Sequence, residues 1–461
     1  MRAHTLAAVV ALALGAVFAL QVAEAGPPDR AEVDVSNLPG PQTNPTIAID
    51  PRDGGVLLAG SNSFLEGTER VYSSIDGGRT WKTENLTPAV KKLGASCSSD
   101  PSVAIDRRGR QYYSFDRSAP CAGDAPSRVY VATRGGPSGV WSTPVLVAKL
   151  GNARIDDKPV IAVDNSATSP HQGRIYVAWA RVSRLVVYSI VLSHSDDGGR
   201  TWSRPVKVNT NGDELNYASV GISRDGIVYV GWTDASQYAI EVARSTDGGE
   251  HFGPEHAAAG FSLIPVPQCG IGLVLRADPR SCIQANPTVT VDSSPGRYSG
   301  RVYVSYTATA YTGIQGPALT TFDASLRPLS GFPLRGQHRI VGRDPSQRYA
   351  TQFWVQSAVD ASDGALWICF YDTAGDPTQT KVHFSCSVSR DGGQSFAGPV
   401  HAASVASDES LPGARQYGYY QGLAVANDVA HPIWTDTRNL GTLAEEVYTA
   451  RLTRAGFDGA R

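Results

Sequence analysis

The sequence lacks the residue patterns from which most protein metal sites are built. It contains six cysteines and nine histidines, but no C-x-x-C pair, and the histidines are scattered along the chain. Zinc sites need closely spaced Cys and His ligands, so we expect no metal and no other cofactor. An excess of one charge is also lacking, since 41 Lys and Arg face 43 Asp and Glu. This balance argues against nucleic acid or an anionic membrane surface as a partner.

Long apolar runs are lacking beyond the N-terminal segment, so we expect no membrane span. The first 25 residues begin with a basic Arg2, continue with an apolar run over residues 6–20 and end in Ala23-Glu24-Ala25. This order is typical of a secretory signal peptide cut after Ala25, with a retained anchor as the alternative. We therefore expect a secreted or periplasmic protein whose residues 26–461 form a single domain, as a monomer.

The six cysteines fall into three pairs of neighbours along the sequence. Export favours disulfides over metal ligation. Six cysteines allow 15 pairings, and proximity within the repeat pattern described below favours one of them: Cys97 with Cys121, Cys269 with Cys282, and Cys369 with Cys386.

One eight-residue pattern occurs four times: SIDGGRTW from Ser74, SDDGGRTW from Ser195, STDGGEHF from Ser245 and SRDGGQSF from Ser389. Each copy follows an alternating, β-branched run. Gly-Gly provides backbone freedom at positive φ, the Asp can accept N–H bonds within a turn, and the final aromatic can pack against neighbouring strands. The pattern predicts four similar hairpin turns.

These turns resemble the Asp box of the sialidase (neuraminidase) superfamily, which lies between the third and fourth strands of β-propeller blades. The resemblance implies an all-β propeller. It also implies a structural role, on the face away from the active site, for Asp76, Asp197, Asp247 and Asp391.

A second repeat predicts the number of blades. A short strand that ends in Asp or a polar residue recurs seven times: PTIAID from Pro45, PSVAID from Pro101, PVIAVD from Pro159, ASVGIS from Ala218, PTVTVD from Pro287, SAVDAS from Ser357 and QGLAVAN from Gln421. An aromatic-rich strand and then a third strand follow, and no amphipathic helix stands out. Seven such modules indicate a propeller of four-stranded blades. Six blades remain the alternative, because catalytic sialidases have six and the fifth module is the weakest.

The seventh module stops after its third strand. The N-terminal run AEVDVSN from Ala31 is free to supply the missing outer strand beside Glu446–Leu452. We therefore expect the two ends of the chain to close the ring together.

The candidate site lies where loops enter the first strands and leave the second strands, around the axis and opposite the Asp boxes. We expect the catalytic residues among Asp100, Asp157, Tyr349, Asp372, Tyr417 and Asp436. Substrate binding is assigned to Arg154, Arg348, Arg415, Arg438 and Tyr419. Sialidase-like chemistry needs arginines that hold a carboxylate, an Asp acid/base and a Tyr nucleophile activated by Glu.

The family's Arg-Ile-Pro signature at the first strand is missing, and Gln42-Thr43-Asn44-Pro45 takes its place. The resemblance therefore covers the scaffold and not the site. Two interpretations remain. One is a glycoside hydrolase that acts on glycan termini with altered specificity. The other is a non-catalytic propeller that binds glycans or proteins of an envelope or extracellular matrix.

Overall fold

The computed structural model describes residues 31–458 apart from 65–67, 91–96, 119–124, 150, 152, 184–187, 262–271, 311–312, 331–338, 345 and 347–348. The expected signal peptide, residues 1–25, lies outside the described residues. Among the described helices, none has the length and apolar character needed to cross a bilayer.

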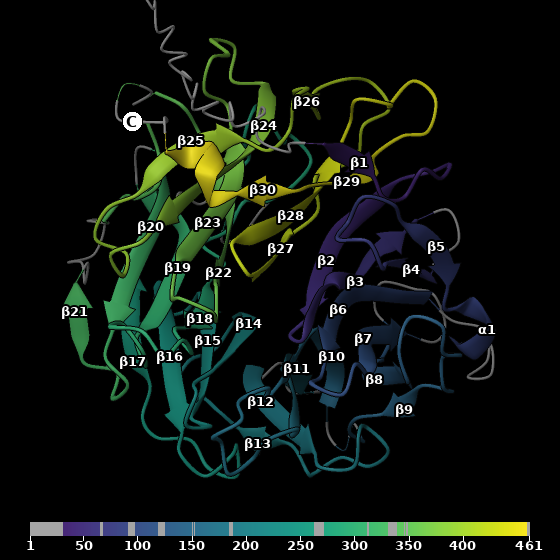
Figure 1. Cartoon of the computed structure of the whole chain (residues 1–461), viewed down its shortest axis with the longest axis vertical. Coiled ribbons are helices and arrows are strands. Elements are labelled where there is room, and N and C mark those ends of the chain that lie inside the picture. The colour runs from purple at the N-terminus through teal and green to yellow at the C-terminus, as the bar shows by residue number, and fades with distance from the viewer. Residues whose placement is uncertain are drawn as a thin grey trace, which may run out of the picture.

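The described strands form seven antiparallel sheets that surround a central axis like the blades of a propeller (Figure 1). Each sheet has a path of four strands, and two sheets carry one extra short strand. The all-β prediction and the count of seven blades are confirmed, and the alternative of six is excluded. The described helices are limited to short turns such as α1 (Thr87–Val90) and η3 (Arg454–Phe457).

The blades follow one another along the chain, and each is written here from its inner to its outer strand. Blade 1 contains β2 (Gln42–Asp50), β3 (Asp53–Ser63), β4 (Thr68–Ser74) and β5 (Lys82–Asn85). Blade 2 contains β6 (Cys97–Ile105), β7 (Gln111–Ser118), β8 (Ser127–Arg134) and β9 (Val145–Leu146). Blade 3 contains β10 (Ala153–Val163), β11 (Ile175–Ser183), β12 (Tyr188–Ser195) and β13 (Val206–Lys207). Blade 4 contains β14 (Leu215–Ile222), β15 (Val228–Asp234), β16 (Ala239–Ser245) and β17 (His256–Gly260).

The remaining three blades complete the ring. Blade 5 contains β18 (Thr288–Val291), β19 (Val302–Ala310), β20 (Gly313–Phe322) and β21 (Pro328–Ser330). Blade 6 contains β22 (Gln352–Val359), β23 (Leu366–Asp372), β24 (Lys381–Ser389) and β25 (Ala397–His401), with β26 (Ser407–Asp408) beside β24. Blade 7 contains β27 (Gly422–Ala426), β28 (Val429–Asp436), β29 (Glu446–Ala450) and β1 (Glu32–Asp34), with β30 (Leu452–Thr453) beside β28. In blade 7, Glu32 of β1 stands opposite Ala450 of β29.

Tryptophans of the second strands fill the spaces between blades. Trp179, Trp232, Trp367 and Trp434 are all fully buried. The ring of Trp434 stacks on Phe384 of the preceding blade at 5.4 Å between centroids. A buried aromatic side chain of this size contributes about 2 to 3 kcal/mol through the hydrophobic effect, so these residues hold the blades together.

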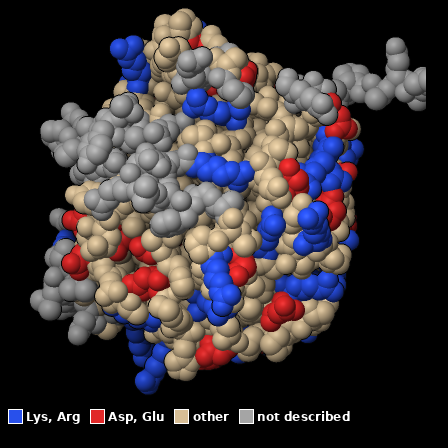
Figure 2. Space-filling model, turned by 90° about the vertical axis from the view of Figure 1, so that its left-hand side faces the viewer, with Lys and Arg blue, Asp and Glu red and all other residues tan. Residues whose placement is uncertain are grey.

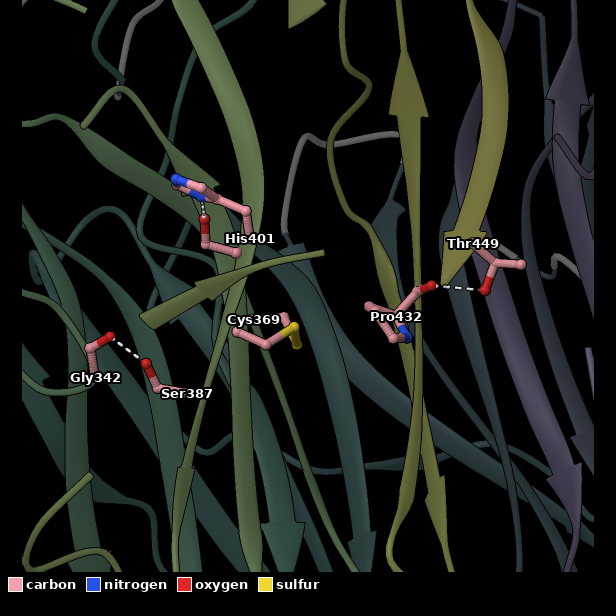
Figure 3. The surroundings of a disulfide bond; sticks show 8 residues. Gly342, Cys369, Ser387, His401, Pro432 and Thr449 are labelled. Atoms are coloured by element: carbon pink, nitrogen blue, oxygen red, sulfur yellow. Dashed lines mark hydrogen bonds between the residues drawn. A yellow bond between two sulfur atoms is a disulfide. The ribbon is translucent and has the colours of Figure 1, made fainter. Parts of the chain in front are cut away.

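The disulfide between Cys369 and Cys386 forms as predicted, between the second and third strands of blade 6 (Figure 3). The two residues stand directly opposite each other in the strand register, and their Cα atoms lie 4.1 Å apart. The general range for disulfides predicted at least about 4.4 Å. The shorter value reflects the close approach of directly paired residues in an antiparallel ladder. Cys97 and Cys282 are also disulfide-bonded, and their predicted partners, Cys121 and Cys269, lie outside the described residues.

The four Asp-Gly-Gly turns share one hydrogen-bond pattern. In blade 3, Asp197 accepts bonds from the Ser195 hydroxyl, from the N–H groups of Arg200 and Thr201, and from the Thr201 hydroxyl. The Ser195 hydroxyl accepts the Gly199 N–H at 2.9 Å. The turns at Asp76, Asp247 and Asp391 repeat these contacts with their own residues. Partial burial raises the pKa of Asp197, but these hydrogen bonds outweigh it and lower the pKa to about 2.

The turns lie at the end of each blade opposite the start of its inner strand. In blade 1, Ser74 pairs with Leu57, and Leu57 pairs with Ile49 near the end of the inner strand.

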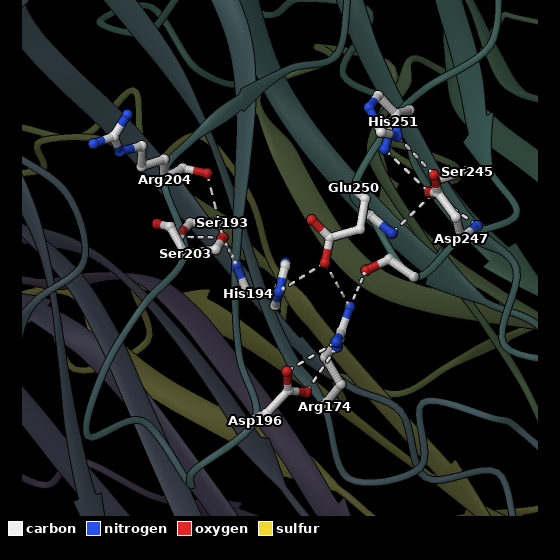
Figure 4. Close-up of polar contacts among 12 residues, drawn as sticks. Arg174, Ser193, His194, Asp196, Ser203, Arg204, Ser245, Asp247, Glu250 and His251 are labelled. Atoms are coloured by element: carbon white, nitrogen blue, oxygen red, sulfur yellow. Dashed lines mark hydrogen bonds and ion pairs between the residues drawn. The ribbon is translucent and has the colours of Figure 1, made fainter.

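Arginines also connect neighbouring blades at this end of the propeller. Arg174 binds Asp196 at 2.8 Å within blade 3, and it donates to the carbonyl of Gly248 in the turn of blade 4 (Figure 4). Arg301 repeats this contact with Gly392. These arginines therefore connect blades 3 and 5 to the Asp-Gly-Gly turn of the next blade.

Replacing Asp197 with Ala should lower the free energy of unfolding by about 1 to 2 kcal/mol, because the N–H groups of the turn lose their acceptor. Thermal unfolding measures this change. The matched control is Asp225→Ala, which removes an exposed aspartate at the same end of blade 4 and should leave stability unchanged. Normal melting combined with a loss of ligand binding would place the turn in the functional site instead.

Candidate functional site

The inner strands of five blades carry the same β-bulge near their first residues. The register slips by one residue between Thr43 and Thr46, Ser99 and Ser102, Asp157 and Val160, Asn216 and Ser219, and Phe353 and Gln356. In each bulge one residue adopts positive φ: Asn44, Asp100, Lys158, Tyr217 and Trp354. Asn and Asp tolerate this conformation, whereas Lys, Tyr and Trp rarely adopt it. Bulges re-aim side chains and concentrate at functional sites, so this ring of positions marks the candidate site.

Three acidic side chains converge at these bulges. Asp100 lies on β6, Asp116 on β7 and Asp157 on β10, and one oxygen from each lies within 4.8 Å of the others. Lys158 meets this group with its ammonium 2.8 Å from Asp157 Oδ2. The same ammonium lies 5.3 Å from the ring centres of Tyr217 and Tyr419. The site therefore combines a carboxylate triad, one cation and two aromatic faces.

Asn44 connects the triad to the tyrosine loop that precedes β27. Its amide nitrogen donates to Asp100 Oδ1 at 2.7 Å, and its amide oxygen accepts the Tyr419 N–H at 2.8 Å. Gly418 has φ of 89°, and a Cβ at this position would lie 2.8 Å from the Asn44 backbone nitrogen. The glycine is therefore required so that the loop can approach β2.

The environments of the acids differ. Burial raises the pKa of Asp100, with a further increase from the Asp157 charge, against the opposing effects of Lys158 and Asn44. Asp116 has its pKa raised well above the usual value by burial and by the two neighbouring carboxylates. Burial lowers the pKa of Lys158, but Asp157 and Asp100 outweigh that effect and raise it. An acid whose pKa is raised, beside a carboxylate that contacts an ammonium, is an arrangement suited to acid/base chemistry.

The triad has the oxygen ligands and the spacing that a divalent cation requires. Lys158 already supplies a positive charge there, and Asn44 and Ser99 donate hydrogen bonds to two of the three carboxylates. The residues present are therefore arranged around an ammonium.

A channel of about 360 Å³ runs along the inner strands next to this group. Its lining includes Lys158, Tyr217, Asn286 and Tyr420, together with main-chain and apolar groups of the inner strands. Tyr420 donates its hydroxyl to the carbonyl of Pro101 at 3.2 Å. Through Lys158, the group thus borders a concave space large enough for a small ligand.

No family model matches this chain. A sialidase from Micromonospora viridifaciens is 27% identical over 227 residues, which cover 45% of this chain and 33% of the relative. A xyloglucanase from Hypocrea jecorina is 25% identical over 251 residues, which cover 49% of this chain and 27% of the relative. The matches therefore span about a third or less of the length of these curated relatives. Among solved structures, a leech intramolecular trans-sialidase has a TM-score of 0.50 and 12% identity, and covers 93% of this chain and 70% of its own.

The chain is a sialidase-like β-propeller. The fold is not confined to sialidases, since a polysaccharide lyase, an ulvan lyase, also has a TM-score of 0.50 at 11% identity and covers 92% of this chain and 96% of its own. The predicted resemblance is confirmed for the scaffold, and the structural likeness concerns the fold alone.

In this sialidase-like propeller, the structure brings together three of the predicted site residues: Asp100, Asp157 and Tyr419. Asp372 is buried and accepts bonds from Gln352 and the Ala374 N–H. Asp436 is buried against Trp434 and Arg438. These carboxylates lie at the ends of second strands, where they bond within their own blades. We therefore find the contacts of Asp372 and Asp436 within their own blades, whereas we expected both residues to line one depression together with Asp100 and Asp157.

Two predicted tyrosines also have other surroundings. Tyr417 is fully buried, with its ring 4.4 Å from that of Tyr371. Tyr349 is 86% exposed. Neither environment provides the Glu-activated, substrate-facing hydroxyl of a sialidase nucleophile.

Two of the predicted arginines have described contacts away from the carboxylate triad. Arg438 pairs with Asp436 and Glu32. Arg415 is exposed, and its guanidinium lies 5.4 Å from the ring centre of Phe64. Arg154 is exposed as well, and Arg348 lies outside the described residues. In the part of the chain that the structure describes, Lys158 provides a cation in contact with the triad.

The roles of Asn44, Lys158 and Tyr217 were not predicted. A signal was present, because the residue before proline at the start of the inner strand is polar in four modules: Asn44-Pro45, Asp100-Pro101, Lys158-Pro159 and Asn286-Pro287. In blades 1, 2 and 3 this position is the positive-φ residue of the bulge.

Proposed function

We propose that this sialidase-like propeller is a glycoside hydrolase that acts on a glycan terminus, with Asp100 as the proton donor and Asp157 as the carboxylate partner. The observation that carries the proposal is the Asp100–Asp157–Lys158 group, which borders the channel through Lys158. Protonated Asp100 would donate its proton to the glycosidic oxygen as the bond to the sugar breaks. The Asp157 carboxylate would bond to the anomeric carbon as the leaving group departs. Water, giving its proton to Asp100, would then break that bond and release the sugar.

The distance between the carboxylates supports retention of configuration. One oxygen from each lies within 4.8 Å of the other, which is short of the roughly 6.5 to 9.5 Å that leaves room for an inverting water. Tyr217 and Tyr419 offer aromatic faces against which a sugar ring can pack.

The charges favour a neutral sugar. A sialic acid carboxylate is best held by arginines in a bidentate geometry, but the cation described at the triad is Lys158, whose charge Asp157 already balances. The matched sialidase supports a glycan substrate, whereas the site supports a substrate without a carboxylate. The signal-peptide-like N-terminus and the disulfides support action outside the cytoplasm.

The test is a screen of purified protein against nitrophenyl glycosides of neutral sugars and of sialic acid, with Asp157→Asn as the inactive control. Nitrophenol release from a neutral glycoside, absent in the variant, is expected. Hydrolysis of the sialoside would contradict the neutral specificity. Binding on a glycan array without hydrolysis of any substrate would replace the enzyme with the binding propeller.

The side of the molecule in Figure 2 shows no extended surface of one sign, because acidic and basic side chains alternate over it. A long polyanion would find little electrostatic attraction on this side. This observation fits recognition of a glycan end in a concave site.

A further inference from the structure

A second set of acidic side chains lies apart from the Asp100–Asp157–Lys158 group, at the base of the tyrosine loop. Glu409 follows β26 and Glu445 precedes β29, and both are 0% exposed. Neither carboxylate oxygen of Glu409 has a hydrogen-bond partner, and one oxygen of Glu445 also lacks one. The other oxygen of Glu445 accepts the N–H of Arg415.

Further oxygen atoms without partners belong to the segments that meet here. The side-chain carbonyl of Gln42 and the hydroxyl of Tyr417 are fully buried and have no hydrogen-bond partner. Gln42 is fixed beside Glu445, because its backbone N–H donates to the Glu445 main-chain oxygen at 2.9 Å. The Gln42 amide nitrogen binds the Gly40 carbonyl, which leaves the amide oxygen available.

Among the described residues, no cation donates a hydrogen bond to either carboxylate. The charge of Arg280 acts on Glu409, but its guanidinium donates to the main-chain carbonyls of Glu409 and Leu411. Burial raises the pKa of Glu409 well above its usual value, and the charges of Glu445 and Asp278 add to this effect. A buried carboxylate without a partner costs several kcal/mol, so a missing positive group is the simplest remedy.

We propose that Glu409, Glu445 and the side-chain oxygen of Gln42 bind one Ca²⁺. The donors are all oxygen, two anionic and one neutral, which is the ligand chemistry of a hard cation. Ca²⁺ accepts six to eight oxygens in irregular geometry, whereas Mg²⁺ requires a near-ideal octahedron. Loop carbonyls and water would complete the shell.

The bound ion would join three segments that are distant in sequence: the start of β2, the loop after β26 and the loop before β29. The Arg415 N–H that binds Glu445 belongs to the loop that continues to Tyr419. Ca²⁺ would therefore order the tyrosine loop whether or not the propeller is a hydrolase.

The experiment measures thermal unfolding of EDTA-treated full-length protein in EDTA, in Ca²⁺ and in Mg²⁺, together with calorimetric titration of Ca²⁺. We expect one Ca²⁺ per chain and a rise in Tm of roughly 5 °C at a hundredfold excess over Kd. Mg²⁺ should produce a smaller rise. Glu409→Gln should abolish the Ca²⁺-dependent rise, while its Tm in EDTA equals or exceeds that of the wild type, because the variant removes an unpaired buried charge.

Two controls locate the ion. Glu214→Gln makes the same chemical change at an exposed position and should keep the full response to Ca²⁺. Asp116→Asn alters the carboxylate triad at the channel and should also keep it. Loss of the response in Asp116→Asn, or its survival in Glu409→Gln, would overturn the proposed site. A wild type with the same Tm in EDTA and in Ca²⁺ and no calorimetric binding would show that the carboxylates are protonated instead.

Discussion

Replacing Asp100 with Asn should lower kcat on the glycoside identified by the screen by about 10² to 10⁴-fold, the usual contribution of a general acid. Asn has nearly the same shape as Asp and can still accept the bond from Asn44, so the bulge of β6 should keep its geometry. It cannot donate the proton that burial and the neighbouring Asp157 hold on Asp100. Steady-state kinetics measures the loss, and an unchanged Tm shows that the fold is intact.

The leaving group separates acid catalysis from a loss of structure. A dinitrophenyl glycoside needs little protonation of its leaving oxygen, so Asp100→Asn should retain much more activity on it than on an alkyl glycoside. Asp225→Asn, at an exposed turn, provides the matched control and should leave both substrates unaffected. If activity on both substrates falls equally in Asp100→Asn, proton donation by this residue is ruled out.

The fold could be predicted because its signals are local and repeated. The Asp-Gly-Gly turns, with their Ser and Thr partners, are complete within eight residues, so the sequence contains the whole hydrogen-bond pattern that forms at Asp197. Seven copies of the inner-strand pattern predicted seven blades. The Cys369–Cys386 pairing followed from two strands joined by a short loop.

The site was harder to predict because it depends on side chains from different blades. Position within a module selected Asp100 and Asp157, which the structure brings close together near the starts of neighbouring inner strands. It could not distinguish them from Asp372 and Asp436, whose oxygens are used by Gln352, Trp434 and Arg438 in their own blades. Nor could it separate buried Tyr417 from Tyr419 two residues later, since Gly418 turns the chain between them.

The positive-φ bulge is the feature that sequence alone could not supply. Lys158 and Tyr217 adopt a backbone conformation that their residue types disfavour. The surrounding sheet maintains it at a cost of about 1 kcal/mol or more per residue. Local preferences therefore predict negative φ at Lys158 and Tyr217. The positive φ that these residues adopt can be understood only from the strand pairing within the closed ring.

Replacing Lys158 with Gln should move the pH optimum to higher pH by about 1 to 3 units, with a loss of roughly 10²-fold or more in kcat/KM at neutral pH. The ammonium lies 2.8 Å from Asp157, and its charge lowers the pKa of Asp100 against the effect of burial. Without it, the pKa of Asp100 rises further. The basic limb, set by loss of the proton from Asp100, should therefore shift upward.

Lys158→Arg tests the charge separately from the shape, because it keeps a cation beside Asp157. It should retain the wild-type pH profile even if the longer, planar head group reduces kcat/KM. Lys158→Gln should also melt at a lower temperature than Lys158→Arg, since Asp157 would then lose its counter-ion. A Lys158→Gln profile that coincides with that of the wild type would show that the ammonium only packs between Tyr217 and Tyr419 and does not set the pKa of Asp100.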